Sequence, residues 1–277
     1  MTCIDKIKFN KVIECIIENN NIPLNEKDLL PIFHVTELGK LDLILDDRKL
    51  EAVNPCEYCN NEHIVFLSYG KISYLPKSLI KDMDIITEDN LPIVFIFEPD
   101  VYKNMHFDRL VCFDSGALIN GRFGISNRLD HYEILKPKKK DILASVWLLF
   151  GNNKEYLKNN IKMHENNNPL SFITKINKLF KDIHKPKIKT GLLQAATFEL
   201  HKKGHFDLTA TKMIVPEKSI SKSPQETIKK YLDNNIEFIT YTDTRIEGNE
   251  NGVENHIILT ELEKTIKNAK NKIYGYN

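Results

Sequence analysis

The chain has 277 residues, of which 42% are hydrophobic and 28% are charged, as is usual for a soluble globular protein. A chain of this length buries a substantial core, as one large domain or as two small ones. Its 39 basic and 38 acidic side chains give a net charge of +1, so the overall charge neither favours nor excludes a class of partner.

The sequence carries no signal for export or for membrane insertion. Residues 1–6 lack the charged and continuously apolar regions of a secretory signal. No apolar run approaches the roughly 20 residues needed to span a bilayer. The five cysteines are odd in number and do not form the pattern of a disulfide scaffold. We therefore expect a cytoplasmic protein without a membrane partner.

Hydrophobic periodicity and turn residues predict the elements in chain order. We expect a helix at 2–19, a strand at 31–36, a helix from 38 to about 48, a strand at 63–68, a helix at 72–86, strands at 91–97 and 109–113, helical sequence at 140–183, strands at 192–201 and 212–215, a helix at 225–232, a strand at 236–241 and a helix at 257–271. Short strands with irregularly placed helices predict an α+β fold. We expect one domain over residues 1–277, with a helical, lysine-rich insertion at about 140–185.

Three polar residues stand in strand-like apolar runs that lie far apart in the sequence: His34, Tyr69 and Glu199. A polar group without a partner in apolar surroundings costs about 1–3 kcal/mol, so buried strands seldom carry such residues. Each has an ordinary structural explanation when taken alone. The histidine could be a satisfied core residue, the tyrosine a rim aromatic and the glutamate a solvent-facing residue. Their order and sequence context favour a functional interpretation.

At these residues the chain resembles the ADP-ribosyltransferase superfamily, particularly bacterial DarT-type enzymes that modify DNA bases. Three short blocks carry the resemblance, and they cover less than a third of the chain. They are residues 31–45, with a strand histidine followed directly by a helix, residues 66–74, with aromatic and cationic residues after a strand, and residues 198–215, with a strand glutamate and a following strand. The resemblance implies a split β-sheet core and NAD as the substrate.

The resemblance also implies roles for individual residues. His34, with Thr36 beside it, would bind the adenosine ribose of NAD, and Tyr69 or Tyr74 would stack on the nicotinamide ring. Glu199 would be the catalytic residue, because a carboxylate stabilises the cation-like centre that forms when nicotinamide leaves.

Two features leave alternatives open. Lys71 stands where the family could place a cation against the pyrophosphate, although arginine is the expected residue for bidentate phosphate contact. The acceptor could be a nucleic acid, a protein or water, and water would make the chain an NAD glycohydrolase. The resemblance suggests a bacterial toxin or anti-phage effector with an antitoxin or immunity partner.

Residues 136–189 contain thirteen lysines against four acidic residues, a local excess of nine positive charges. Such a stretch can follow a phosphate backbone, although a solvated helix face is the more common explanation. A second hypothesis is therefore a non-catalytic nucleic-acid-binding protein that uses this basic region.

Two further motifs have competing explanations. Cys56 and Cys59, with His63 nearby, supply fewer ligands than the four of a structural zinc site, so we expect two loop thiols and no metal. The run Phe113-Asp114-Ser115-Gly116 has ordinary turn chemistry, and its alternative is a supporting role at the site.

Overall fold

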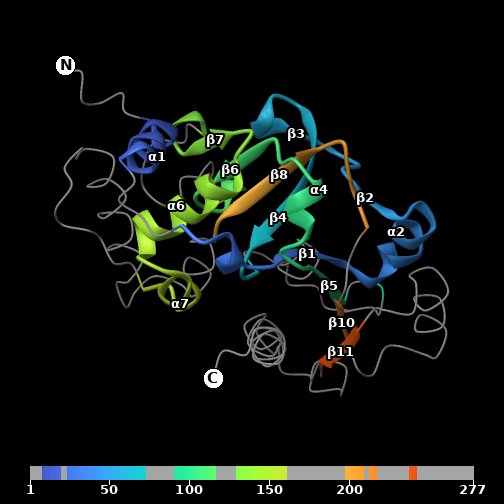
Figure 1. Cartoon of the computed structure of the whole chain (residues 1–277). Coiled ribbons are helices and arrows are strands. Elements are labelled where there is room, and N and C mark those ends of the chain that lie inside the picture. The colour runs from blue at the N-terminus through green and yellow to red at the C-terminus, as the bar shows by residue number, and fades with distance from the viewer. Residues whose placement is uncertain are drawn as a thin grey trace, which may run out of the picture. The chain divides into compact units, whose positions relative to one another are not determined.

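The computed structural model describes residues 8–19, 24–72, 89, 91–116, 129–160, 197–208, 212–216 and 237–241. Contacts within the chain define two compact units. Unit 1 comprises Met1–Pro31, Ala52–Ser73 and Pro99–Gly204, and unit 2 comprises Ile32–Glu51, Tyr74–Glu98 and His205–Asn277. Both units contain helices and strands, which confirms the α+β class (Figure 1). The expectation of one domain over residues 1–277 stays a prediction.

Unit 1 combines an antiparallel sheet with most of the described helices. Its helices are α1 (Phe9–Glu18), η2 (Glu26–Asp28), η4 (Glu57–Cys59), α4 (Val101–Asn104), η6 (Leu129–His131), α6 (Lys139–Phe150) and α7 (Asn153–Leu157). Its strands are β3 (Pro55–Cys56), β4 (Glu62–Tyr69), β6 (Arg109–Val111), β7 (Glu133–Leu135) and β8 (Glu199–Lys203).

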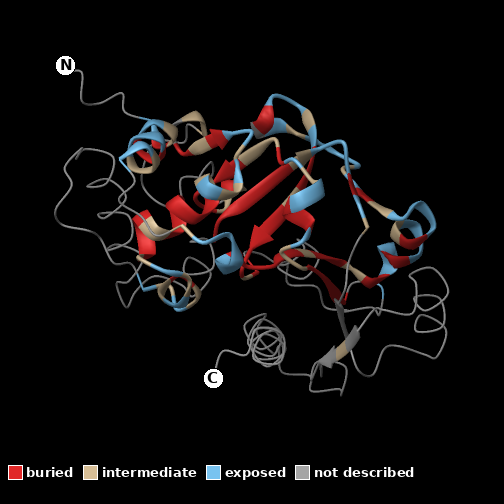
Figure 2. Ribbon diagram, in the orientation of Figure 1, coloured by how far each residue is buried: buried red, intermediate tan, exposed pale blue. Residues whose placement is uncertain are grey.

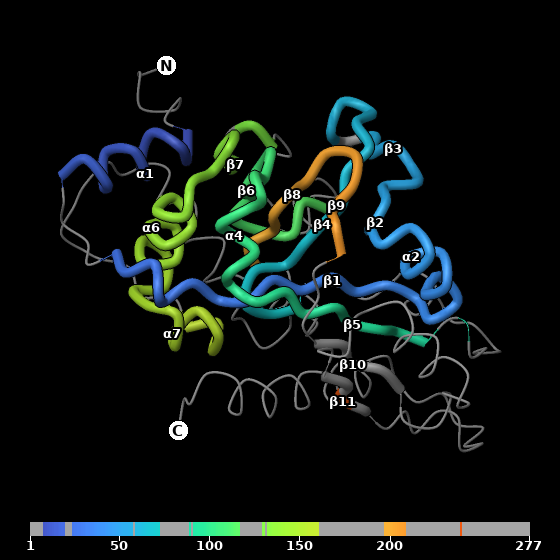
Figure 3. Tube along the Cα trace, turned by 45° about the vertical axis from the view of Figure 1, so that its right-hand side comes forward, coloured from blue at the N-terminus to red at the C-terminus, as the bar shows by residue number. Residues whose placement is uncertain are grey.

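The sheet of unit 1 has the strand order β4-β8-β6-β7, and β3 pairs with β4. Every one of these pairs is antiparallel. Strand β8 therefore lies between β4, which is about 130 residues earlier in the chain, and β6, as Figures 1 and 3 show. This central position places Glu199 in the interior of unit 1.

Helix α6 supplies much of the core of unit 1. Asp141 caps its start, because the Lys138 main-chain N–H donates to Asp141 Oδ2 at 2.7 Å. Gly151 ends it with φ of 81°, a conformation that favours glycine. Eight of its twelve residues are buried (Figure 2). Helix α1 packs against it, and Phe9, Val12 and Ile13 of α1 are buried. The start of the stretch predicted to be helical, Lys139–Phe150, is therefore a helix of the core, and the insertion itself stays a prediction.

The described part of unit 2 contains a second set of strands and two short helices. Its strands are β1 (Ile32–Glu37), β2 (Lys49–Glu51), β5 (Pro92–Phe97), β9 (His205–Asp207), β10 (Lys212–Pro216) and β11 (Glu237–Tyr241), and its helices are η3 (Leu38–Lys40) and α2 (Leu41–Asp47). Strand β5 lies between β1 and β10, both antiparallel to it, and all six of its residues are buried. Strand β11 is parallel to β10, and β2 forms a separate pair with β9.

Most predicted elements that fall on described residues are present. The strands at 31–36, 63–68, 91–97, 212–215 and 236–241 are confirmed within two residues, and the first helix is confirmed over residues 9–18. The strand predicted at 109–113 ends at 111, and β8 occupies only the end of the predicted run 192–201. The helices predicted at 72–86, 225–232 and 257–271 lie outside the described residues. Within the described part of the chain, no helix has the length and apolar character to cross a membrane.

Candidate functional site

One face of the unit 1 sheet carries a row of polar side chains. Glu199, His201 and Lys203 are alternate residues of β8, so their side chains share a face. The register places Ser68 of β4 opposite Glu199 and Arg109 of β6 opposite His201. Residues from three strands therefore meet on this face, where Glu199 and His201 are both buried.

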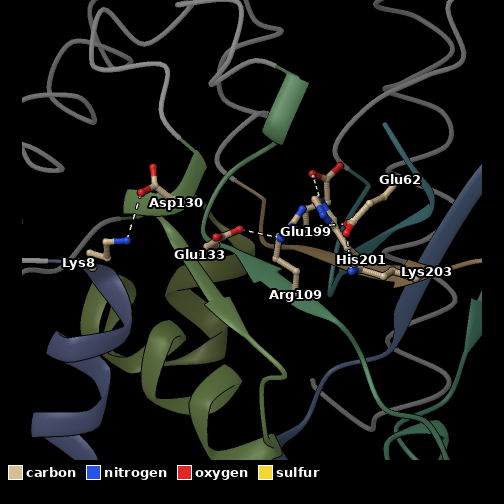
Figure 4. Close-up of polar contacts among 8 residues, drawn as sticks. All are labelled: Lys8, Glu62, Arg109, Asp130, Glu133, Glu199, His201 and Lys203. Carbon is tan, nitrogen blue, oxygen red and sulfur yellow. Dashed lines mark hydrogen bonds and ion pairs between the residues drawn. The ribbon is translucent and has the colours of Figure 1, made fainter. Parts of the chain in front are cut away.

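A main-chain N–H group and an imidazole nitrogen hold the carboxylate of Glu199. The main-chain N–H of Ser115 donates to Oε2 at 3.0 Å. Nε2 of His201 lies 2.9 Å from the same oxygen, as Figure 4 shows. The side chain of Glu199 is 3% exposed, and that of His201 is 0% exposed. Ser115 belongs to the run 113–116, so its supporting role at the site, the alternative to a simple turn, has a structural basis.

Within the described ranges, the one side chain with a nitrogen paired to the Glu199 carboxylate is the imidazole of His201. Among the described residues, no lysine or arginine lies within ion-pair distance of its carboxylate. The neighbouring guanidinium of Arg109 instead pairs with Glu133, with Nε 2.6 Å from Oε2, and lies 3.8 Å from Glu62. Lys203 also pairs with Glu62, at 2.5 Å, as Figure 4 shows. The nearby cations are thus neutralised by other carboxylates.

Tyr69 lies on the opposite face of the sheet from Glu199. Ser68 is the register partner of Glu199, and the next residue of a strand points the other way. The Tyr69 ring is fully buried beside the rings of Tyr156 and Phe198, and its hydroxyl oxygen accepts a hydrogen bond from Leu30 N–H at 3.1 Å. The structure therefore separates Tyr69 from Glu199 and shows no open ring face for stacking on nicotinamide.

Lys71 is bound within unit 1. Its ammonium group donates to the Tyr156 carbonyl oxygen at 3.1 Å and to the Asn159 side-chain oxygen, and it lies 4.3 Å from the centroid of the Tyr156 ring. These contacts give the lysine a structural role in joining the end of β4 to α7. A contact with pyrophosphate would require it to exchange these partners.

The remaining predicted NAD contacts belong to unit 2. His34 and Thr36 are alternate residues of β1 and share one face, with Phe95 and Ile93 as their register partners on β5. Thr36 is buried, whereas His34 is partly exposed. Tyr74 lies outside the described residues. The structure thus brings His34 and Thr36 together on one strand.

Cys56 and Cys59 are free thiols at the turn between β3 and β4. Burial, followed by a hydrogen bond with the Cys56 thiol, raises the pKa of the Cys59 thiol to about 12. The Nδ1 atom of the His63 ring lies 2.8 Å from the Ala52 carbonyl oxygen. In the described ranges, no three His, Cys, Asp or Glu side chains form a group that could hold a metal ion.

His201 is the site residue that the sequence analysis missed. Its signal was the spacing Glu199-x-His201, which places both side chains on one face of any strand.

Of the thirteen lysines at 136–189, only six fall on described residues, and five of these are exposed. Lys139 is partly buried and pairs with Glu26 at 3.0 Å. These placements fit a solvated surface and do not by themselves define a nucleic-acid interface.

No family model and no curated protein matches the chain. Among solved structures, the chain is similar to Thermus sp. 2.9 DarT in complex with carba-NAD+, with a TM-score of 0.43 and 9% sequence identity. The likeness covers 76% of this chain and 95% of that chain.

Proposed function

We propose that the chain is an NAD-dependent ADP-ribosyltransferase in which Glu199 is the catalytic residue. The observation that carries the proposal is a buried carboxylate held by Ser115 N–H and His201, with no lysine or arginine beside it in the described part of the chain. Burying an ion without a counter-ion costs on the order of several kcal/mol. Such a cost is typical of functional sites, where the charge acts on a ligand.

The chemistry of ADP-ribosyl transfer suits such a carboxylate. The bond between C1′ of the nicotinamide ribose and the ring nitrogen breaks, and its electron pair leaves with neutral nicotinamide. Positive charge then develops at C1′, and a preorganised anion stabilises it in a site that excludes water. The nucleophilic atom of the acceptor bonds to C1′ and transfers its proton to the carboxylate.

The contacts proposed for NAD follow from the placement of each residue. His34, with Thr36 on the same face of β1, is the proposed partner of the adenosine ribose. The buried ring of Tyr69 favours Tyr74 as the residue that stacks on nicotinamide. Because Lys71 already binds Tyr156 and Asn159, we assign it no contact with pyrophosphate.

The proposed biological role is that of a bacterial toxin or anti-phage effector with a nucleic acid or protein acceptor and an antitoxin or immunity partner. The test incubates the protein with NAD labelled in the adenylate, together with DNA, RNA or protein, or with buffer alone. Label transfer and nicotinamide release are measured for the natural sequence, for Glu199→Gln and for Glu14→Gln. Glu14 is the matched control because its carboxylate is exposed and pairs only with Lys11 among the described residues.

We expect label on one acceptor class, a loss on the order of 100- to 1000-fold for Glu199→Gln, and no loss for Glu14→Gln. Equal rates for the natural sequence and Glu199→Gln would remove the assigned role of Glu199. Nicotinamide release without label transfer would instead define an NAD glycohydrolase. Salt-dependent nucleic-acid binding with no NAD cleavage would support the non-catalytic hypothesis, provided that it survives Glu199→Gln and fails when the lysines of 136–189 are neutralised.

A further inference from the structure

Both described donors to the Glu199 carboxylate reach the same oxygen. Ser115 N–H lies 3.0 Å from Oε2, and Nε2 of His201 lies 2.9 Å from that atom. Among the described residues, nothing donates a hydrogen bond to Oε1. Two donors on one oxygen fix the position and the rotation of the carboxylate, because neither bond survives a turn of the group. This arrangement leaves Oε1 to a ligand.

The two ring nitrogens of His201 have different surroundings. Its Nδ1 atom is buried and has no hydrogen-bond partner in the described part of the chain. With a proton on Nε2, the ring donates to Oε2 of Glu199, which can only accept when it is ionised. His201 is therefore assigned as a donor through Nε2–H.

The fold also fixes the orientation of the His201 ring. The side chain is completely buried, and the ring of Phe66 meets it edge-to-face, with centroids 4.9 Å apart. Phe66 is the register partner of His201 on β4, so the strand pairing itself sets this contact. The donor to Oε2 is consequently in place before any ligand binds.

We propose that His201 is the positioning residue of the catalytic step, holding Oε2 of Glu199 so that Oε1 faces the nicotinamide ribose of NAD. This inference rests on the proposed ADP-ribosyl transfer. In that step the C1′–nitrogen bond breaks with its electron pair on nicotinamide, the acceptor bonds to C1′, and the acceptor's proton passes to Oε1. His201 keeps its Nε2 proton throughout and does not contact NAD, so it acts through Glu199 alone.

Three substitutions of His201 separate this role from simple packing. The side-chain nitrogen of Gln reaches the position of the imidazole Nε2, whereas that of Asn reaches only the position of Nδ1. Phe fills the space without a donor. We expect His201→Gln to keep most of the activity, and His201→Asn and His201→Phe to lose up to about 100-fold in kcat, since small misplacements of a catalytic group have effects of this size. The KM for NAD should change less than threefold in all three.

A double-mutant cycle distinguishes a positioning role from a packing role, because the rates of the single and double variants differ between the two. In the Glu199→Gln background, His201→Phe should lower the residual rate no further, because the positioned carboxylate is already gone. Equal activity of the Gln, Asn and Phe variants would overturn the inference, as would additive losses in the cycle. If Asn or Phe prevents folding, the comparison of His201→Gln with the natural sequence still decides, since a folded Gln variant that loses about 100-fold also contradicts the proposal.

The outcomes separate the two proposals. Absence of nicotinamide release from the natural sequence contradicts the proposed function. Release that depends on Glu199 but not on the residue at position 201 contradicts the positioning role of His201 and leaves the proposed function intact.

Discussion

The hydroxyl of Tyr156 joins the strand of Tyr69 to the segment that leads into β8. It donates to the Tyr69 carbonyl oxygen at 2.6 Å and accepts from the Phe198 main-chain N–H at 3.1 Å, inside a fully buried cluster. Substitution of Tyr156 by Phe removes both bonds and leaves the ring contacts. The Tyr69 oxygen keeps a second donor, the Lys71 N–H at 2.8 Å. The Phe198 N–H loses its only partner among the described residues.

The expected cost follows from this difference. A buried N–H without a partner costs about 1–3 kcal/mol, so we expect Tyr156→Phe to lower the free energy of unfolding by about 2 kcal/mol. For a chain of this size, that loss corresponds to a fall in Tm of about 4–8 °C. Urea unfolding can be followed by the fluorescence of Trp147, the one tryptophan of the sequence, which lies on α6 in the same unit.

The matched control is Tyr102→Phe. The Tyr102 hydroxyl donates a longer hydrogen bond, 3.3 Å, to the Leu30 carbonyl oxygen, so its loss should cost less. A free energy of unfolding for Tyr156→Phe within about 0.5 kcal/mol of the natural sequence would refute the reasoning, because a buried bridging hydroxyl cannot be removed at so small a cost.

Three further predictions concern an ion pair and the cysteines of unit 1. Arg109→Met leaves the carboxylate of Glu133 largely buried without its guanidinium, and should cost about 2–3 kcal/mol in urea unfolding after allowance for partial exposure, whereas Arg109→Met with Glu133→Leu should recover at least half of it. Iodoacetamide at pH 8 should alkylate exposed Cys15 and spare buried Cys59 and Cys112 until urea is added, as mass spectrometry would show. The pKa of the Cys59 thiol is raised to about 12 in the folded chain, so the unfolded thiol ionises first as the pH rises. The contribution of Cys59 to the free energy of unfolding should therefore be lost between about pH 9 and about pH 12. A free energy of unfolding that stays constant over that range would contradict this assignment.

Strands that consist of a continuous apolar run could be predicted from the sequence. Strand β5 is buried on both faces and appears as the continuous apolar run Pro92–Phe97. Strands β2 and β9 could not be predicted, because each has three residues and a single buried side chain, Leu50 or Phe206, between exposed or partly exposed neighbours. They exist because they pair with each other across about 150 residues, which no local pattern encodes.

The site shows the same limit. The strand position of Glu199 could be predicted from the apolar residues around it, and its burial, which is unusual for a carboxylate, comes from the structure. Tyr69 looked equally unusual, but only the register of β4 with β8 reveals that its ring points away from Glu199. The contact of Ser115 with Glu199 joins residues 84 positions apart, so it follows from the pairing of β6 with β8 and not from either local sequence.

The proposed function requires that Glu199 drives the cleavage of NAD. The decisive measurement is the rate of nicotinamide release from NAD by the natural sequence and by Glu199→Gln, with both proteins shown to be equally folded by Trp147 fluorescence. We predict measurable release by the natural sequence and a rate on the order of 100- to 1000-fold lower for the variant. Equal rates, or no release by either protein with any acceptor, would contradict the account.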